Sequence, residues 1–392
     1  MSLSQLSVGA QTRSNIDISK QGLDLRMNHH AVEFIRSLLQ KQLFNQVTDT
    51  LDVALMDHFN RVRIKDSTKF DIHKQLKDFL PGFGGNASEA SACIQYEFDL
   101  KSGKIIDLEL TPGKRPDSKD ALEKFSDIHK NDLIIRDLGY FVLDVLSDIQ
   151  QAGAYFISKL NYKTTVYETT EVSLSELDFE KLYHDMKQSG ITRMEKQVLI
   201  GKNDKLPVRL IIERMPDQVY EQRVRKVKAY NHKKGHQISA GYTDRARFNL
   251  FVTNIGPQML ALQTIPLFYK IRWQVELIFK VWKSTFGIQA TRKMKLERFL
   301  CLLYSKLLLI MVNWEIIIAH RNNIYTTTGR WLSIDKCFKT LKNNTEKFRD
   351  ILVHASTAAE LIKWIGLMFG SKHWLEKRKN RLNYEEIINI IC

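Results

Sequence analysis

Between residues 61 and 160, short segments that alternate like β-strands are separated by segments with the period of amphipathic helices. The strand pattern occurs in RVRIKDST (61–68), which we expect to end at Asp66, in DLIIRD (132–137) and in AYFISKL (154–160). CIQYEFDL and KIIDLEL, joined by Lys-Ser-Gly, resemble a β-hairpin. Helical spacing follows at 118–129 and 141–153. This order predicts an α/β fold, a mixed sheet with helices packed on it.

The segments outside this region set the expected domain limits. Residues 1–50 have helical spacing, 161–265 hold four further strand-like segments, and helices follow from 265 to the C-terminus. We therefore expect a core at 51–160 and 266–300, a β-rich insertion at 161–265, and helical regions at 1–50 and 301–392. The most apolar stretch, Leu302–Ile318, contains Lys306 and Glu315, which favours a buried helix over a membrane span.

The charge balance indicates a polyanionic partner. Lys and Arg number 59 against 44 Asp and Glu, which gives a net charge of +15. Such a surplus attracts nucleic acids, although charge alone does not distinguish them from other partners. The four cysteines lack the spacing of a zinc site or disulfide framework, and the N-terminus lacks an apolar signal segment. We therefore expect a cytoplasmic protein with no membrane partner.

The segment FYKIRWQVELIFKVWKS (268–284) predicts a helix with two contrasting faces. At 100° per residue, one narrow face carries Tyr269, Arg272, Glu276 and Lys283. The opposite face carries Ile271, Val275, Ile278 and Trp282. The charged face has two interpretations. It could form ordinary surface ion pairs, or Glu276 could ligate a hard cation while the two bases hold phosphates beside it.

The spacing Tyr269-x2-Arg272-x3-Glu276-x6-Lys283 resembles the Tyr-Arg-Glu-Lys signature of DDE transposases from bacterial insertion sequences, in the group called insertion-sequence family four. LFVTNI (250–255) is similar to the strand that precedes this helix in the family. The resemblance extends over most of the chain from about residue 20 onward. It implies a ribonuclease-H-like core interrupted by the β-rich insertion, and a metal centre that uses Mg²⁺ or, in its place, Mn²⁺.

The family requires two upstream aspartates at strand ends, and Asp66 and Asp137 match them. Carboxylates from two strand ends and one helix can converge on a pair of ions about 3.5–4 Å apart. The resemblance thus makes Asp66, Asp137 and Glu276 the catalytic metal ligands. Two alternatives stay open: Asp66 could cap a turn or helix, and Asp137 could belong to a turn. The neighbouring acids that could be mistaken for the ligands are Asp57, Asp132 and Asp144.

The resemblance also implies a function. Members cut and paste DNA: water attacks one strand, and the freed 3′-hydroxyl then attacks another phosphodiester. Tyr269, Arg272 and Lys283 would hold the terminal phosphates, and Trp273 would either stack there or pack in the core. The partners would be double-stranded DNA, as terminal inverted repeats and as target, bound by a dimer associated with the nucleoid. Members usually begin with a longer end-binding domain, so residues 1–50 would be a truncated form of it.

A basic cluster between 221 and 247 is a second candidate DNA contact. We single out Arg223, Arg225, Lys226 and Lys228, with a solvated hairpin or loop as the alternative. Two other functions remain open. One is a metal-dependent nuclease on the same core, which would have no reason to keep the Tyr, Arg and Lys of the signature. The other is a truncated or inactive DNA-binding descendant of a transposase, in which the acidic ligands would decay.

Overall fold

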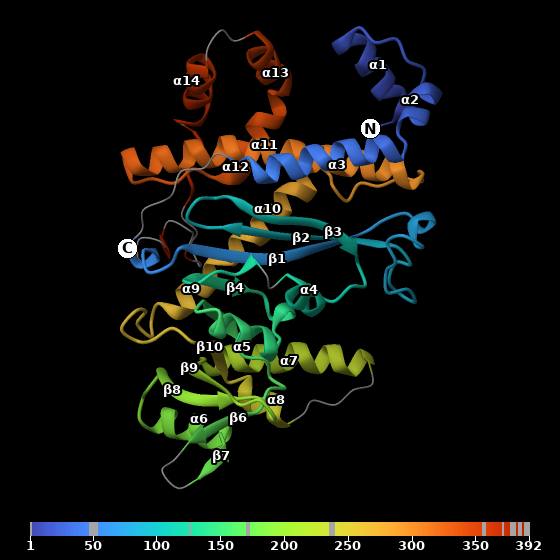
Figure 1. The fold of residues 1–392 in the computed structure, drawn as a ribbon. Coiled ribbons are helices and arrows are strands. Elements are labelled where there is room, and N and C mark those ends of the chain that lie inside the picture. The colour runs from blue at the N-terminus through green and yellow to red at the C-terminus, as the bar shows by residue number, and fades with distance from the viewer. Residues whose placement is uncertain are drawn as a thin grey trace. The chain divides into compact units, whose positions relative to one another are not determined.

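The structure is a computed structural model that describes residues 2–46, 54–124, 127–169, 173–234, 240–354, 358–370, 372–376, 382 and 386–387. The chain divides into two compact units, each built from distant segments. Unit one contains 1–51, 67–115 and 274–385, and unit two contains 52–66, 116–273 and 386–392. Figure 1 shows the elements of both units.

Unit two is built on a mixed sheet. Strand β1 (Arg61–Asp71) contributes its first half and pairs in parallel with β4 (Asp132–Arg136), which pairs in parallel with β5 (Tyr155–Lys159). The rest of the sheet is antiparallel, in the order β5-β10-β9-β8-β6-β7. These strands are β10 (Phe248–Thr253), β9 (Leu206–Arg214), β8 (Arg193–Ile200), β6 (Val166–Thr169) and β7 (Leu174–Glu176).

Helices of unit two pack on this sheet and share one apolar core with it. Ile149 of α5, Phe156 of β5, Met186 of α6 and Leu210 of β9 belong to the same buried cluster. The strands at 161–265 therefore extend the sheet of the first part and bury side chains in its core. The helices are α4 (Asp117–Glu123), α5 (Leu143–Gln151), α6 (Phe179–Gln188), α7 (Asp217–Lys234), α8 (Ala240–Arg245) and α9 (Ile265–Ile271).

Unit one combines the hairpin β2 (Ser91–Asp99) and β3 (Ile105–Pro112) with the second half of β1 and a set of helices. Helix α3 (His29–Phe44) lies along α11 (Leu296–Thr328) (Figure 1). Buried Trp314 of α11 donates a hydrogen bond of 2.7 Å to the carbonyl of Gly103 in the hairpin turn. The other helices are α1 (Leu3–Ser14), α2 (Lys20–Arg26), α10 (Trp273–Ser284), α12 (Ile334–Asn343), α13 (Thr345–His354) and α14 (Ala358–Phe369).

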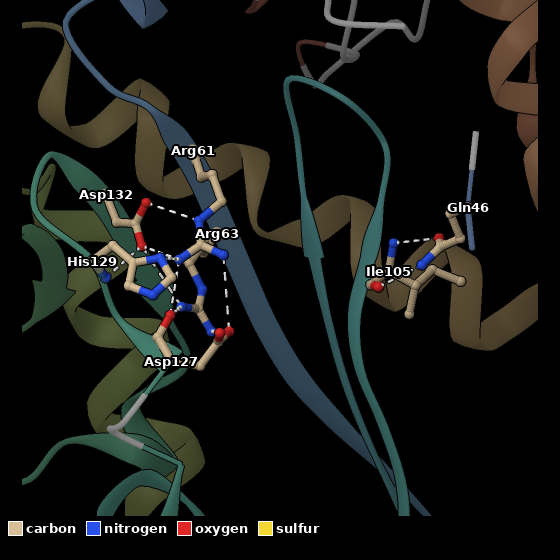
Figure 2. A network of polar contacts seen from close by, with 7 residues as sticks. All are labelled: Gln46, Arg61, Arg63, Ile105, Asp127, His129 and Asp132. Carbon is tan, nitrogen blue, oxygen red and sulfur yellow. Dashed lines mark hydrogen bonds and ion pairs between the residues drawn. The ribbon is translucent and has the colours of Figure 1, made fainter. Parts of the chain in front are cut away.

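Strand β3 is the edge of the sheet in unit one, and a glutamine side chain pairs with it. The Gln46 amide nitrogen donates to the carbonyl of Ile105 at 2.7 Å, and the Gln46 amide oxygen accepts from the Ile105 N–H at 2.7 Å (Figure 2). The carboxamide thus replaces one residue of a neighbouring strand.

Helix α11 is long and apolar enough to cross a membrane by length and composition alone. Half of its most apolar window is buried within the protein. Trp314 and Ile317 of this helix are at most 2% exposed. The packing on α3 and on the β2–β3 hairpin is that of a core helix, as the charges within the stretch predicted.

Several expected boundaries were wrong. Strand β1 continues past Asp66 to Asp71, because the alternation persists and Phe70 is buried. The helix expected at 265–286 is two helices, α9 and α10, which meet at Arg272. The basic residues 223–228, for which a solvated hairpin or loop was the alternative to a DNA contact, lie on helix α7, whose Glu, Gln, Lys and Arg favour a helix without needing an apolar face.

Candidate active site

Asp66 and Asp137 are brought side by side by the parallel pairing of β1 and β4. The register pairs Ile64 with Ile135 and Lys65 with Arg136. Asp66 and Asp137 are the next residues along the two strands. Because neighbouring strands of a sheet lie about 4.8 Å apart, the pairing places the two carboxylates at one position across the sheet.

Arg272 connects the two carboxylates. One guanidinium nitrogen, Nη1, forms an ion pair with Asp66 Oδ2, and Nη2 lies 3.3 Å from Asp137 Oδ1. The side chains of Arg272 and Asp66 are 12% and 14% exposed, whereas that of Asp137 is 43% exposed. The two acids therefore lie within reach of one cationic group, with Asp137 on the solvent side.

The local structure excludes helix capping by Asp66, whereas Asp137 does begin a turn, in which its carbonyl accepts the N–H of Tyr140 at 3.0 Å. Asp66 lies within a strand and caps neither a turn nor a helix. Asp137 precedes a short 3₁₀ turn, Leu138–Tyr140, but its side chain makes no capping hydrogen bond. Both carboxylates contact the shared guanidinium of Arg272.

The neighbouring acids have other surroundings. Asp132 is buried at the opposite end of β4, where Arg61 Nε donates to it at 2.9 Å and the backbone N–H of His129 donates at 2.9 Å (Figure 2). Arg63, also buried, lies 3.7 Å from the same carboxylate. Asp144 is exposed in the first turn of α5, and Asp57 lies in the turn before β1. Asp132 therefore compensates buried arginines.

A phenol and a lysine lie beside the Arg272 bridge. The Tyr269 ring is 5.6 Å from the Arg272 guanidinium and 5.5 Å from Lys159 Nζ. Burial raises the pKa of Tyr269, so the phenol stays protonated. Desolvation lowers the pKa of Lys159, as do the nearby positive charges of Arg223 and Arg272, while Asp137 raises it. Lys159 thus adds positive charge to that of Arg272 beside the paired acids.

Lys159 is a site residue that the sequence reasoning missed. It ends β5, the strand next to β4, so it lies at the edge of the sheet where β4 leads into Asp137. A usable signal existed, because carboxyl ends of parallel strands meet at one edge and AYFISKL was recognised as a strand.

In unit one, Glu276 stands on the exposed face of α10. The opposite face is buried: Val275, Ile278 and Trp282 are at most 1% exposed, as their spacing predicted. Trp282 packs edge-on against Tyr96 of β2 with ring centres 5.0 Å apart. This packing fixes the rotation of α10 and leaves Glu276 directed outward.

Glu276 borders a groove of about 500 Å³ within unit one. Its walls are Ser67, Thr68, Glu276, Phe279, Lys280, Lys283, Ser284 and Gln289. Lys283 Nζ donates to the carbonyl of Lys69 at 3.0 Å, and burial lowers the pKa of Lys283. Hydroxyl, ammonium and carboxylate groups therefore face the same space, which suits a phosphodiester with an associated cation.

The four basic residues singled out on α7 divide into two kinds. Arg223 donates to the carbonyls of Ala246 and Phe248 at 3.2 and 2.9 Å, which anchors α7 to the segment leading into β10. Arg225, Lys226 and Lys228 are exposed. Trp273 is half-buried, and this degree of exposure is compatible both with stacking on DNA and with packing in the core.

Comparison with known proteins decides the family. The profile described as "Transposase DDE domain" matches residues 57–312. The chain belongs to the DDE transposases. It is 32% identical over 363 residues to the transposase for insertion sequence element IS231B of Bacillus thuringiensis subsp. berliner, covering 86% of this chain and 76% of that protein. It is 30% identical over 360 residues to the transposase for IS1151 of Clostridium perfringens, covering 86% and 75%.

This transposase is therefore an enzyme that acts on DNA, and divalent metal dependence is a property of its domain. The matched segment begins just before β1 and ends within α11. It contains Asp66, Asp137, the Arg272 bridge and the Glu276 groove.

Proposed function

We propose that this transposase moves an insertion sequence by cut-and-paste chemistry, with Asp66, Asp137 and Glu276 as its metal ligands. The observation that carries the proposal is the pairing of two acids from separate strands with one cationic group. Arg272 and Lys159 supply positive charge beside the acids in the protein alone, and two neighbouring carboxylates are also a donor set that a divalent cation takes.

The donor set fits a hard divalent cation, for which we propose Mg²⁺ with Mn²⁺ as a substitute. Mg²⁺ takes oxygen ligands and is commonly held by one or two carboxylates together with substrate phosphates. Asp66 and Asp137 offer such oxygens at one position across the sheet. When bound, a pair of such ions activates water and stabilises the attacking and leaving oxygens of a phosphodiester.

Two local facts support Glu276 as the third ligand. Side chains alternate along a strand, so Thr68 lies on the same face of β1 as Asp66. Thr68 also lines the groove that contains Glu276. Arg272 has helical backbone angles between α9 and α10, and Glu276 follows it by one helical turn.

The basic residues would bind and orient the DNA backbone. Arg272, Lys159 and Lys283 are cations beside the acids or in the groove, and the protonated phenol of Tyr269 can donate a hydrogen bond to a phosphate oxygen. Arg225, Lys226 and Lys228 on α7 would contact phosphates farther from the cut.

The proposed substrates are the terminal inverted repeats of the element and a target duplex. Joining two ends to one target requires that both ends be held together, so we propose a dimer on DNA. A protein with this substrate would work in the cytoplasm at the nucleoid.

Isosteric substitutions test the assignment. Asp66→Asn, Asp137→Asn and Glu276→Gln should each lower cleavage of a duplex carrying the element's end by at least about a hundredfold, because each removes a charged ligand. Binding of the same duplex in Ca²⁺ should change little. Asp144→Asn is the matched control, since Asp144 is exposed on α5.

Cleavage by Asp66→Asn at the parent rate would overturn the ligand assignment. The products separate the competing functions. A transposase joins the freed 3′-end to a second duplex, a nuclease only releases it, and an inactive descendant binds the end without cutting it.

A further inference from the structure

A fully buried ion pair lies directly behind the strand that carries Asp66. Lys65 Nζ is 2.6 Å from Asp120 Oδ2, and both side chains are 0% exposed. Lys65 precedes Asp66 on β1, and Asp120 lies on α4. Because side chains alternate along a strand, Lys65 points to the face of the sheet opposite to Asp66. The pair therefore joins helix α4 to the strand of the first proposed ligand.

Stability alone does not account for such a pair. Taking two opposite charges out of water costs free energy, and well-packed apolar side chains in their place are often equally stable or more stable. A charged hydrogen-bonded contact differs from an apolar contact in its geometry, because it fixes which atoms meet and in what direction. The burial of this pair beside Asp66 thus points to a role in the geometry of the site.

Asp137 depends on neighbouring structure for the position of its carboxylate. Strand β4 ends at Arg136, and the last register pair of β1 and β4 is Lys65 with Arg136. Asp137 has therefore left the strand, and it begins the 3₁₀ turn Leu138–Tyr140. Whatever holds this turn also sets the distance between the Asp137 and Asp66 carboxylates.

Helix α4 packs against that turn. A Cβ on Gly139 would lie 3.0 Å from Asp117 Oδ2 and 3.4 Å from Asp117 Cβ, so the turn and the first residue of α4 are in close contact. Ala121 of α4 and Tyr140 of the turn belong to the same buried apolar cluster. With 7 residues and no side-chain N-cap, α4 needs tertiary contacts to keep its place. The ion pair with Lys65 is one such contact.

We propose that Lys65 and Asp120 are positioning residues, which act through α4 to hold Asp137 at its distance from Asp66. The two carboxylates repel each other, and Arg272 offsets this repulsion only while it contacts both of them. A buried contact behind the sheet keeps their spacing when the guanidinium binds elsewhere. The inference rests on the proposed function, in which both acids are metal ligands.

A double substitution tests this role without leaving a buried charge unpaired. Lys65→Met/Asp120→Leu replaces both charged groups by apolar side chains of similar size and leaves the net charge unchanged, so its thermal unfolding should match that of the parent. Mn²⁺ binding to the free protein, followed by electron paramagnetic resonance, should weaken about tenfold, the usual effect of losing a group that orients metal ligands. The kcat of DNA cleavage should fall, whereas affinity for the same duplex in Ca²⁺ should stay unchanged.

Two further variants locate the effect. Lys196→Gln/Glu168→Gln removes a half-buried ion pair between β8 and β6 of the same sheet, and it should bind Mn²⁺ like the parent. Asp66→Asn removes a proposed ligand and should bind Mn²⁺ more weakly than the parent.

The outcomes separate the positioning role from the ligand assignment. Parent-like Mn²⁺ affinity in the Lys65→Met/Asp120→Leu variant, with a loss in Asp66→Asn, would overturn the positioning role alone. Parent-like affinity in both variants would overturn the ligand assignment and the positioning role with it. A sharp fall in the unfolding temperature of the double variant would also overturn the proposal, because the pair would then serve the stability of the fold.

Discussion

Arg272 forms an ion pair with Asp66 across 206 residues of sequence. The same guanidinium reaches Asp137 at 3.3 Å, so one side chain compensates charge from two strands. The divalent cation proposed above would use the same oxygens. Its binding would then compete with the pairing to Arg272, and the guanidinium would be free to bind a phosphate.

This competition predicts the metal affinity of Arg272→Ala. Without the guanidinium, the free protein should bind Mn²⁺ about tenfold more tightly, since a nearby positive charge has been removed. DNA cleavage should nevertheless fall, because a phosphate contact is lost. Electron paramagnetic resonance of free Mn²⁺ measures the first quantity, and Arg272→Lys, which keeps the charge, should bind Mn²⁺ like the parent. Equal Mn²⁺ affinity in the parent and Arg272→Ala would contradict the competition.

Lys159 predicts a pH dependence of DNA binding. Its pKa is lowered by desolvation and by Arg223 and Arg272, so it loses its proton at a lower pH than an ordinary lysine. The phosphate contact is present below that pKa and is lost as the pH rises through it. DNA affinity of the parent should therefore decline earlier in the alkaline range than that of Lys159→Arg. Fluorescence anisotropy across a pH series measures it, and superimposable curves would count against a Lys159 contact.

Asp132 should act on stability and not on chemistry. Asp132→Asn removes the charge of a buried carboxylate that pairs with Arg61 and lies 3.7 Å from Arg63, while Asp127 remains within ion-pair distance of both, so the free energy of unfolding should fall by about 1–3 kcal/mol. Urea unfolding measures this change. The folded fraction should still cleave DNA at the parent rate. A variant of unchanged stability that fails to cleave would instead make Asp132 part of the active site.

The exposed residues of α7 should contribute to DNA affinity through charge alone. Replacing Arg225, Lys226 and Lys228 together by glutamine should reduce the slope of log affinity against log salt by about three, because three phosphate contacts are lost. The melting temperature should stay the same, since these side chains are exposed. Lys202→Gln, in the exposed β8–β9 turn, is the control. A parent-like salt slope in the triple variant would remove α7 from the DNA-binding surface.

The parallel part of the fold was predictable from local pattern. Strands β1, β4 and β5 each carry buried apolar residues within a short strand-like segment, and the helix between β4 and β5 has clear spacing. Asp66 and Asp137 were singled out because a family motif surrounds each of them, and their role as metal ligands stays a prediction; Asp137 follows the end of β4, whereas Asp66 lies in the middle of β1. The course of β1 past Asp66 was missed, although the alternation that continues to buried Phe70 was a local signal for it.

Other site features depend on tertiary contacts that a sequence does not display. Arg223 looks like one more member of a basic run, yet carbonyls of residues 246 and 248 make it an anchor. Lys159 resembles any lysine at the end of a strand until the Tyr269 ring is placed 5.5 Å away. In both cases the identity of the residue was visible and its surroundings were not.

The paired hydrogen bonds between Gln46 and Ile105 have a consequence for the solubility of the protein. An edge strand exposes unpaired backbone N–H and C=O groups that can bind an extended segment of another molecule. Repeated pairing of this kind leads to aggregation. The Gln46 side chain forms hydrogen bonds with the N–H and C=O groups of Ile105, so these groups cannot pair with a strand of another molecule. This position of β3 is therefore closed to the strand-to-strand pairing that leads to aggregation.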